Sequence, residues 1–439
     1  MQRFNAFLIS LFLLSALPSH SEIRTKLLAE DLSFISPDYT AVSSKNFAFV
    51  GGLVRSNPKP DDAFRLDLTA LYAVGNSVLS YLNLREIYYN NNIDEVSTLQ
   101  IGRHLMTWSA LDSAFHMGVF QPQFRWNQLI PENQGLTGLF WTKNTDTYGL
   151  TLFASPLYIP DQGAGYEIKD GQFQTGNPFF QAPPQNVRFQ GQLLPIDYEI
   201  NKPEISNVIY QTEIGAQYRY GEAKGIFGTI SGIFKPSNQL ALGYKGVLVT
   251  TRVKVDVTPK TYLENDYAAD IGYRDDWGKF VFSALYSKPQ DPDFDSSFNA
   301  PHFEPSLSFG PQVLYRLKPF EFFAAYLDTS GGAITDKGPD ATPDRASLSE
   351  RFLYRQAAVL SATYTDVFWK QLRLDSTFEF KFSSKESFRQ IRFKNSFKLR
   401  GPWGAWVDMI LIDTDSTLQS NMEIYKNLDQ VWVGVTYDI

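Results

Sequence analysis

The sequence predicts an all-β fold, an antiparallel transmembrane β-barrel of about 16–18 strands with up-and-down topology. Three observations lead to this prediction: an export signal at the start of the chain, alternation of apolar and polar residues in segments of about ten residues, and a last segment with the same alternation. Together they describe an exported chain whose strands have one apolar face and one polar face.

The first 21 residues have the features of a cleaved signal peptide. Arg3 precedes an apolar run over 6–17 that is too short to cross a bilayer, and small residues follow before Glu22. The segment 22–45, which precedes the first predicted strand, is too short for a plug domain, but it could form a short N-terminal hatch. The expected domains are a signal peptide at 1–21, a short periplasmic segment at 22–45 and the barrel at 46–439 with a long loop at 155–208.

The composition excludes several classes of protein. The chain has no cysteine, which excludes disulfides, thiolate metal sites and cysteine nucleophiles. A formal net charge of −7 argues against non-specific nucleic-acid binding. With 43% hydrophobic and 20% charged residues, the chain is too polar for a helical membrane protein, but it suits strands that present only every second residue to lipid.

Alternation with a period of two recurs along the chain. In the segment 64–72, Phe64, Leu66 and Leu68 share one face, while Arg65 and Asp67 share the other. The same pattern predicts further strands at 212–220, 247–257, 280–286, 307–317, 320–326 and 352–364. From Phe47 onwards there are about 18 such segments, which lies in the size range of channel-forming barrels.

The spacing of the connections tests this count of strands. Long loops in such a barrel fall at one end, at every second connection. This rule holds toward the C-terminus but fails at the long links 107–134 and 155–208. We therefore expect one miscounted strand before residue 107 and another between residues 208 and 280, with a total of 16, 18 or 20.

For one hairpin near the C-terminus, the sequence predicts which residues of the two strands lie opposite each other. With a loop at 383–390, one antiparallel pairing explains both faces of the two strands at 372–382 and 391–399. The outer face then pairs Phe380 with Phe393 and Leu374 with Leu399, and the inner face pairs Glu379 with Lys394 and Asp375 with Lys398.

The inner face of this hairpin carries six cations and two carboxylates in an otherwise acidic chain. These residues are Arg373, Asp375, Glu379, Lys381, Arg392, Lys394, Lys398 and Arg400. Arg252 and Lys254 are expected to face the lumen from the strand at 247–257. A narrow channel with one sign of charge selects counter-ions, here anions. The alternative is that these cations pair with acidic residues on neighbouring strands.

The last segment alternates apolar residues at 431, 433, 435, 437 and 439 with Trp432, Gly434, Thr436 and Asp438. It resembles the final strand of outer-membrane β-barrel proteins, in which an aromatic residue third from the end and an apolar last residue are recognised by the assembly machinery. The resemblance implies this role for Tyr437 and Ile439. The most common last residue in that family is Phe, so Ile439 departs from the pattern.

A second stretch contains Ile101-Gly102-Arg103, followed by Trp108, Asp112 and a Gln-rich region at 121–134. It looks like the Gly-Arg strand and following loop of alginate-export-type and related porin-like barrels. That resemblance covers about 40 residues and implies a channel for anionic or saccharide solutes with Arg103 in the lumen. A structural ion pair between Arg103 and the barrel wall is an equally good interpretation.

The segment 155–208 is rich in Pro, Gly, Gln and Asn and predicts a long loop. It either folds inward as the gate of the channel or lies on the surface. An enzymatic role is a poor expectation, because His104 and His116 lie in no recognisable catalytic motif. Asp291, Asp293 and Asp295 alternate in a loop without the pattern of a calcium site. We therefore expect no catalytic residues, no metal and no cofactor.

The sequence thus predicts an exported outer-membrane channel of the Gram-negative type for passive or facilitated diffusion of small, anionic or saccharide solutes. The expected partners are outer-membrane lipid, the barrel-assembly machinery and small solutes, with no nucleic acid, and homo-oligomerisation is left open. The alternatives are a non-conducting surface or adhesion protein and a transporter for hydrophobic, fatty-acid-type substrates.

Overall fold

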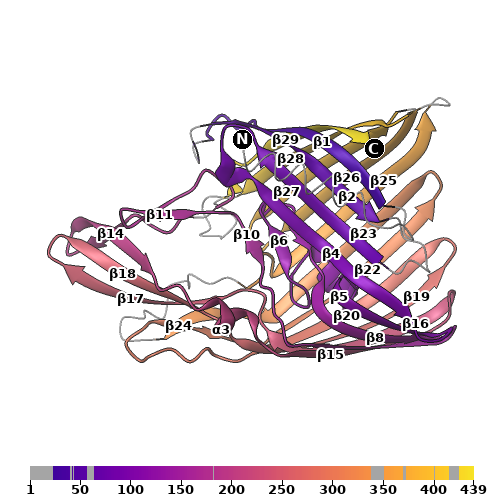
Figure 1. Ribbon diagram of the computed structural model, residues 1–439, viewed down its shortest axis with the longest axis horizontal. Coiled ribbons are helices and arrows are strands. Elements are labelled where there is room, and N and C mark those ends of the chain that lie inside the picture. Colours follow the sequence, from indigo (N-terminus) through magenta and orange to yellow (C-terminus); the bar gives the residue numbers. More distant parts are fainter. Residues whose placement is uncertain are drawn as a thin grey trace.

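The computed structural model is a closed antiparallel barrel of 18 strands with smaller sheets at one end (Figure 1). It describes residues 23–39, 42, 44–56, 64–180, 182–337, 351–368, 372–399, 401–414 and 425–439. The predicted signal peptide lies outside the described residues. The barrel strands are β1 (Ile23–Phe34), β2 (Asn46–Ser56), β3 (Phe64–Ala73), β4 (Tyr81–Asn92), β5 (Ser97–His104), β8 (Leu136–Asn144), β9 (Tyr148–Ser155), β15 (Glu213–Tyr220), β16 (Gly225–Pro236), β19 (Leu263–Asp275), β20 (Gly278–Pro289), β22 (Ser306–Leu317), β23 (Phe320–Gly331), β25 (Gln356–Phe368), β26 (Leu372–Ser383), β27 (Phe388–Lys398), β28 (Trp403–Thr414) and β29 (Gln430–Asp438).

Closure depends on β1, which pairs with β2 on one side and with β29 on the other. In the second pairing Lys26 lies opposite Asp438, and Leu32 lies opposite Trp432. The ladder therefore has no free edge, as a barrel in a bilayer requires. The predicted antiparallel barrel is confirmed, with 18 strands.

The prediction of a periplasmic segment at 22–45 is wrong, because β1 occupies residues 23–34. Its alternation was hard to recognise, since Leu27 and Leu28 are adjacent apolar residues and Asp31 is on the outer face. β1 is the strand that the count missed before residue 107.

The prediction of a barrel strand at 247–257 is also wrong. This segment contains the turn between β17 (Ala241–Val249) and β18 (Arg252–Lys260), where Thr250 has a φ of 54°. The two strands form a hairpin outside the barrel. This accounts for the expected miscount between residues 208 and 280.

With these two corrections, every connection longer than ten residues joins two strands at the same end of the barrel, which we call the loop end. They are 35–45, 105–135, 156–212, 237–262, 290–305, 332–355 and 415–429. The opposite end, where β1 begins and β29 ends, is called the turn end. Within the described residues, no helix is long and apolar enough to cross a membrane.

The predicted faces of β26 and β27 agree with the structure, but the predicted register does not. Phe378 and Phe382 are exposed on the outer surface, whereas Lys381 is buried inside. Phe393 lies opposite Phe378, two residues from the predicted partner, and Glu379 lies opposite Arg392. The turn contains only residues 384–387, so pairing begins earlier than expected. A shift of two residues leaves each side chain on its predicted face.

A four-stranded sheet projects beyond the loop end, on the left of Figure 1. It has the order β13 (Asn186–Phe189), β14 (Gln192–Ile200), β18 and β17, with Ile196, Tyr198 and Val257 in its own small core. The remaining elements are η1 (Ser77–Leu79), α2 (Ala110–Phe115), β6 (Gln123–Arg125), β7 (Glu132–Asn133), β10 (Gln162–Gly163), β11 (Glu167–Lys169), β12 (Gln172–Gln174), α3 (Ile205–Ile209), β21 (Ala300–Phe303) and β24 (Ile334–Lys337).

Candidate functional site

The lumen is narrowed by the connection between β5 and β8, residues 105–135, which we call the in-folded segment. Its helix α2 begins after Ser109, whose Oγ accepts a hydrogen bond from the Asp112 backbone N–H at 3.4 Å. The helix ends at His116, which adopts the left-handed conformation with a φ of 49°. α2 contacts β20, β22 and β23, far around the barrel from β5. The in-folded segment therefore crosses the lumen.

Polar side chains of the far wall hold the backbone of the in-folded segment. Gln217 donates to the Thr107 carbonyl at 2.8 Å, and Ser231 donates to the Trp108 carbonyl at 2.6 Å. Asp270 accepts from the Ala110 backbone N–H at 3.1 Å. These bonds satisfy backbone groups that are shielded from water, and so they fix the position of the segment.

The in-folded segment also has an apolar core in common with the wall. Trp108 and Phe120 are buried, with their rings stacked at 5.9 Å, and they pack with wall residues such as Phe153 and Leu285. The loop-end half of the lumen thus contains apolar side chains, whereas we expected charged residues inward throughout. The burial of Asp112 in this core raises the pKa of its carboxyl group, which accepts bonds from the backbone N–H groups of 119 and 120.

The predicted long loop at 155–208 divides into two parts. Its first part, including β10, pairs with β6 of the in-folded segment, and Phe179 packs against Trp126 with ring centroids 5.7 Å apart. Its second part supplies β13 and β14 to the projecting sheet. The residues that cross the lumen are therefore those of the in-folded segment, and the loop at 155–208 covers them at the loop end.

Beside the in-folded segment lies a cavity of about 600 Å³. One side is formed by Phe115, His116, Leu129 and Glu132 of that segment, and the other by wall residues of β4, β26 and β27. Tyr354, just before β25, completes the lining. The charged side chains in the cavity are Arg85, Glu132, Glu379, Lys381 and Arg392.

Each cation of this cavity has a carboxylate partner. Arg392 forms a two-pronged pair with Asp408, with distances of 2.5–3.2 Å, and Arg85 lies 3.3 Å from Asp67. Lys381 has a longer contact, 3.6 Å from Glu379, and its ammonium group lies 5.8 Å from the centroid of the Tyr354 ring. The cavity therefore contains fixed charges of both signs.

The other residues of the predicted basic strip lie nearer the turn end. Arg373 pairs with Asp375 at 3.2 Å, and Lys398 lies 3.8 Å from Asp438. The structure therefore favours the alternative in which several of these cations pair with carboxylates. Lys394 lies on the same inner face, while Arg400 lies outside the described residues. Their influence on ion selectivity stays a prediction.

Arg103 is buried at 4% exposure and supports the in-folded segment. It donates to the Gly135 carbonyl at 3.0 Å and to the Gln134 side-chain oxygen at 2.8 Å. Its partners are thus amide oxygens where the segment rejoins the wall, so neither the channel-lining role nor the ion pair describes its contacts.

Arg252 and Lys254 do not face the lumen, which corrects that prediction. Both lie on β18 in the projecting sheet, where Arg252 pairs with Asp197 and Lys254 with Glu199, each at 2.7 Å. Their alternation with valines reflects the two faces of that sheet.

The two histidines of the lumen differ in environment. His116 lines the cavity, and burial lowers its pKa to about 4, so its ring is neutral at pH 7. His104 packs against Tyr88 and Phe140 and lies 3.4 Å from Glu86. Neither environment resembles a catalytic pair formed by a nucleophile and a general base.

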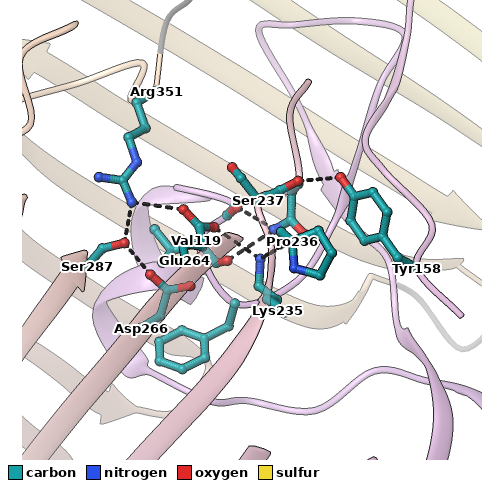
Figure 2. A network of polar contacts seen from close by, with 12 residues as sticks. Val119, Tyr158, Lys235, Pro236, Ser237, Glu264, Asp266, Ser287 and Arg351 are labelled. Atoms are coloured by element: carbon teal, nitrogen blue, oxygen red, sulfur yellow. Dashed lines mark hydrogen bonds and ion pairs between the residues drawn. The ribbon is translucent and has the colours of Figure 1, made fainter. Parts of the chain in front are cut away.

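A buried ionic network fixes the loop end on another side of the lumen (Figure 2). Lys235 donates to Glu264 at 3.2 Å and to the Pro236 carbonyl at 3.1 Å, while the other Glu264 oxygen accepts from Arg351 at 2.9 Å. Ser287 connects Arg351 to Asp266 by short hydrogen bonds. The network contains two cations and two acidic side chains, and it joins the wall to the connection 332–355.

No family model matches the chain, and no curated protein matches it. Among solved structures, OccK3 (OpdO) of Pseudomonas aeruginosa is similar, with 11% identity, coverage of 97% of each chain and a TM-score of 0.47. OccAB4 of Acinetobacter baumannii has 10% identity, coverage of 96% of this chain and 99% of its own, and a TM-score of 0.46. A BenF-like porin from Pseudomonas fluorescens Pf-5 has 7% identity, coverage of 95% and 98%, and a TM-score of 0.46.

Proposed function

We propose that this protein is a porin-like channel of the outer membrane through which small solutes, anionic or saccharide, diffuse past the in-folded segment. The observation that supports this most directly is a closed barrel with an apolar outer surface whose lumen is narrowed to a cavity with fixed charges of both signs. A constriction of this kind selects solutes by size and by charge.

The lining of the cavity suits a solute with polar groups and some apolar surface. Lys381 is the cation with the longest contact to a carboxylate, so it is the one most available to an anionic group. Gln121 and Asn133 add amide groups that can bond hydroxyls, and Phe115 and Leu129 add apolar contact. The excess of cations on β26 and β27 favours anions over neutral sugars.

Charge reversal near the turn end tests the preference for anions. We expect Lys394→Glu with Lys398→Glu to lower the anion-to-cation permeability ratio, because these side chains lie on the lumen face of β27. The measurement is the reversal potential of the reconstituted protein in a planar bilayer under a KCl gradient.

Lys254→Glu is the matched control, since this lysine is charged and exposed but lies in the projecting sheet. Its selectivity should equal that of the wild type. An unchanged reversal potential in the double variant would remove the role of these lysines in selectivity.

We also propose that Tyr437 and Ile439 contribute to recognition by the barrel-assembly machinery in the outer membrane. Both are exposed on the outer face of β29 or just beyond it, next to the closing pair with β1. Tyr437→Ala should lower the amount of folded barrel in outer-membrane fractions, measured by heat-modifiable gel mobility. Tyr315→Ala, an exposed tyrosine near the turn end of β22, is the control and should assemble normally.

The projecting sheet favours a second candidate, a surface protein whose barrel is only a platform. This sheet extends beyond the loop end, away from the lumen (Figure 1). A platform would give no ohmic current in a bilayer, so conductance separates the two functions. A fatty-acid-type transporter with an N-terminal hatch has less support, because residues 23–34 form a wall strand.

A further inference from the structure

The turn end of the lumen contains cations on four strands that lie close together around the barrel. They are Arg219 on β15, Arg274 on β19, Lys279 on β20 and Arg316 on β22, all on the inner face and all near the turn end of their strand. Arg316 pairs with Glu321 at 2.9 Å. The two arginines on β15 and β19 have a different environment.

Arg219 and Arg274 are held by neutral groups. Arg219 donates to the Asn144 side-chain oxygen at 2.7 Å, and Arg274 donates to the Glu222 carbonyl at 2.9 Å and the Gly221 carbonyl at 3.2 Å. The Arg274 guanidinium also lies 4.7 Å from the ring centroid of Phe227. These contacts fix both guanidinium groups without neutralising them.

Two of the nearby carboxylates, Asp275 and Asp276, are engaged by a lysine. Lys224 holds Asp275 at 3.8 Å and also pairs with Asp276. Over the part of the chain that the structure describes, no carboxylate lies within 4.0 Å of either arginine. Both therefore have charge and N–H donors to offer to a ligand.

The two arginines line one pocket of about 270 Å³ at the turn end. Thr145 and Thr229 add hydroxyl groups to its lining, while Asp146 is the opposing charge. Two fixed guanidiniums and one carboxylate give the pocket a positive balance. Because the arginines are already positioned, a ligand loses little side-chain entropy in binding them.

We propose that Arg219 and Arg274 form an oxyanion-binding site, for a carboxylate or a phosphate group, at the turn end of the lumen. Guanidinium groups recognise both anions through paired, charge-assisted hydrogen bonds. The site captures anions as they pass between the cavity and the solution at that end. This inference extends the proposed channel function and rests on it.

The test uses the full-length protein in a planar bilayer in KCl, with sodium phosphate or sodium succinate added to one side at a time. We expect saturable block of the KCl current by at least one of the two anions, from the turn-end side. Arg219→Gln with Arg274→Gln should raise the half-blocking concentration about tenfold or more, since charge-assisted bonds are lost. The two anions distinguish a phosphate site from a carboxylate site.

Lys279→Gln with Arg316→Gln is the matched control, because it removes two positive charges from the neighbouring strands and leaves the pocket intact. An equal loss of block in the control would show diffuse attraction by the rim and overturn the site, and so would the absence of block of the wild type by both anions. Heat-modifiable mobility confirms that each variant is folded.

Calorimetry on the detergent-solubilised protein separates this inference from the channel proposal. If the wild type conducts no current, the channel function fails, and the site is then judged by heats of phosphate and succinate binding. Binding lost in the Arg219 and Arg274 variant alone supports the site, while equal heats in all variants refute it.

Discussion

Replacing residues 107–133 with a short Gly-Ser linker is expected to raise the single-channel conductance several-fold. The in-folded segment crosses the lumen and contributes Trp108, Phe115 and Phe120 to the core of its loop-end half. A barrel of 18 strands without such a segment leaves a wide aqueous channel. The measurement is single-channel current in a planar bilayer at fixed voltage and salt.

The matched control shortens the hairpin of β17 and β18, which lies outside the barrel. That deletion removes chain from the same end of the molecule and should leave the conductance as it is. Circular dichroism and heat-modifiable mobility establish that both variants keep the barrel. If the variant without residues 107–133 conducts like the wild type, the in-folded segment is not the constriction.

The alternation of residues was sufficient to predict the barrel and the faces of its strands, because lipid on one side and water on the other impose the same period on every strand. Val433 and Val435 are exposed on the outer face of β29, and Trp432, which belongs to the other face, is buried inside, as expected. The exact register of β26 and β27 could not be predicted from alternation. A shift of two residues leaves every side chain on the same face, and the register then depends only on the length of the turn.

The in-folded segment was not predictable from alternation. It has one helix of six residues, too short for a periodic pattern, and its position depends on contacts far away in the sequence, such as Ser231 with the Trp108 carbonyl. Leu285 and Leu327, which pack against it, are apolar residues on the inner face. The excess of inward apolar residues near the loop end was the signal that could have indicated a filled lumen.

Glu264→Gln is expected to destabilise the folded protein by about 3–5 kcal/mol, the usual cost of leaving buried charges without their partner. The Lys235 side chain is 0% exposed, that of Glu264 is 3% exposed and that of Arg351 is 6% exposed. The substitution leaves both cations facing a neutral amide, and the acidic side chain that remains in the network, Asp266, reaches Arg351 only through Ser287 (Figure 2). Urea unfolding in lipid vesicles, followed by tryptophan fluorescence, measures the free energy of unfolding.

The effect should extend to the current through the channel. Arg351 holds the start of the short segment that leads to Tyr354, which lines the cavity, so weakening the contact of Arg351 with Glu264 should increase fluctuations of the open-channel current. Glu321→Gln is the matched control, because its pair with Arg316 is half-exposed, at 45% and 55%, and such pairs contribute about 1 kcal/mol or less. Equal stability losses for the two variants would show that the buried network adds no more than a surface pair.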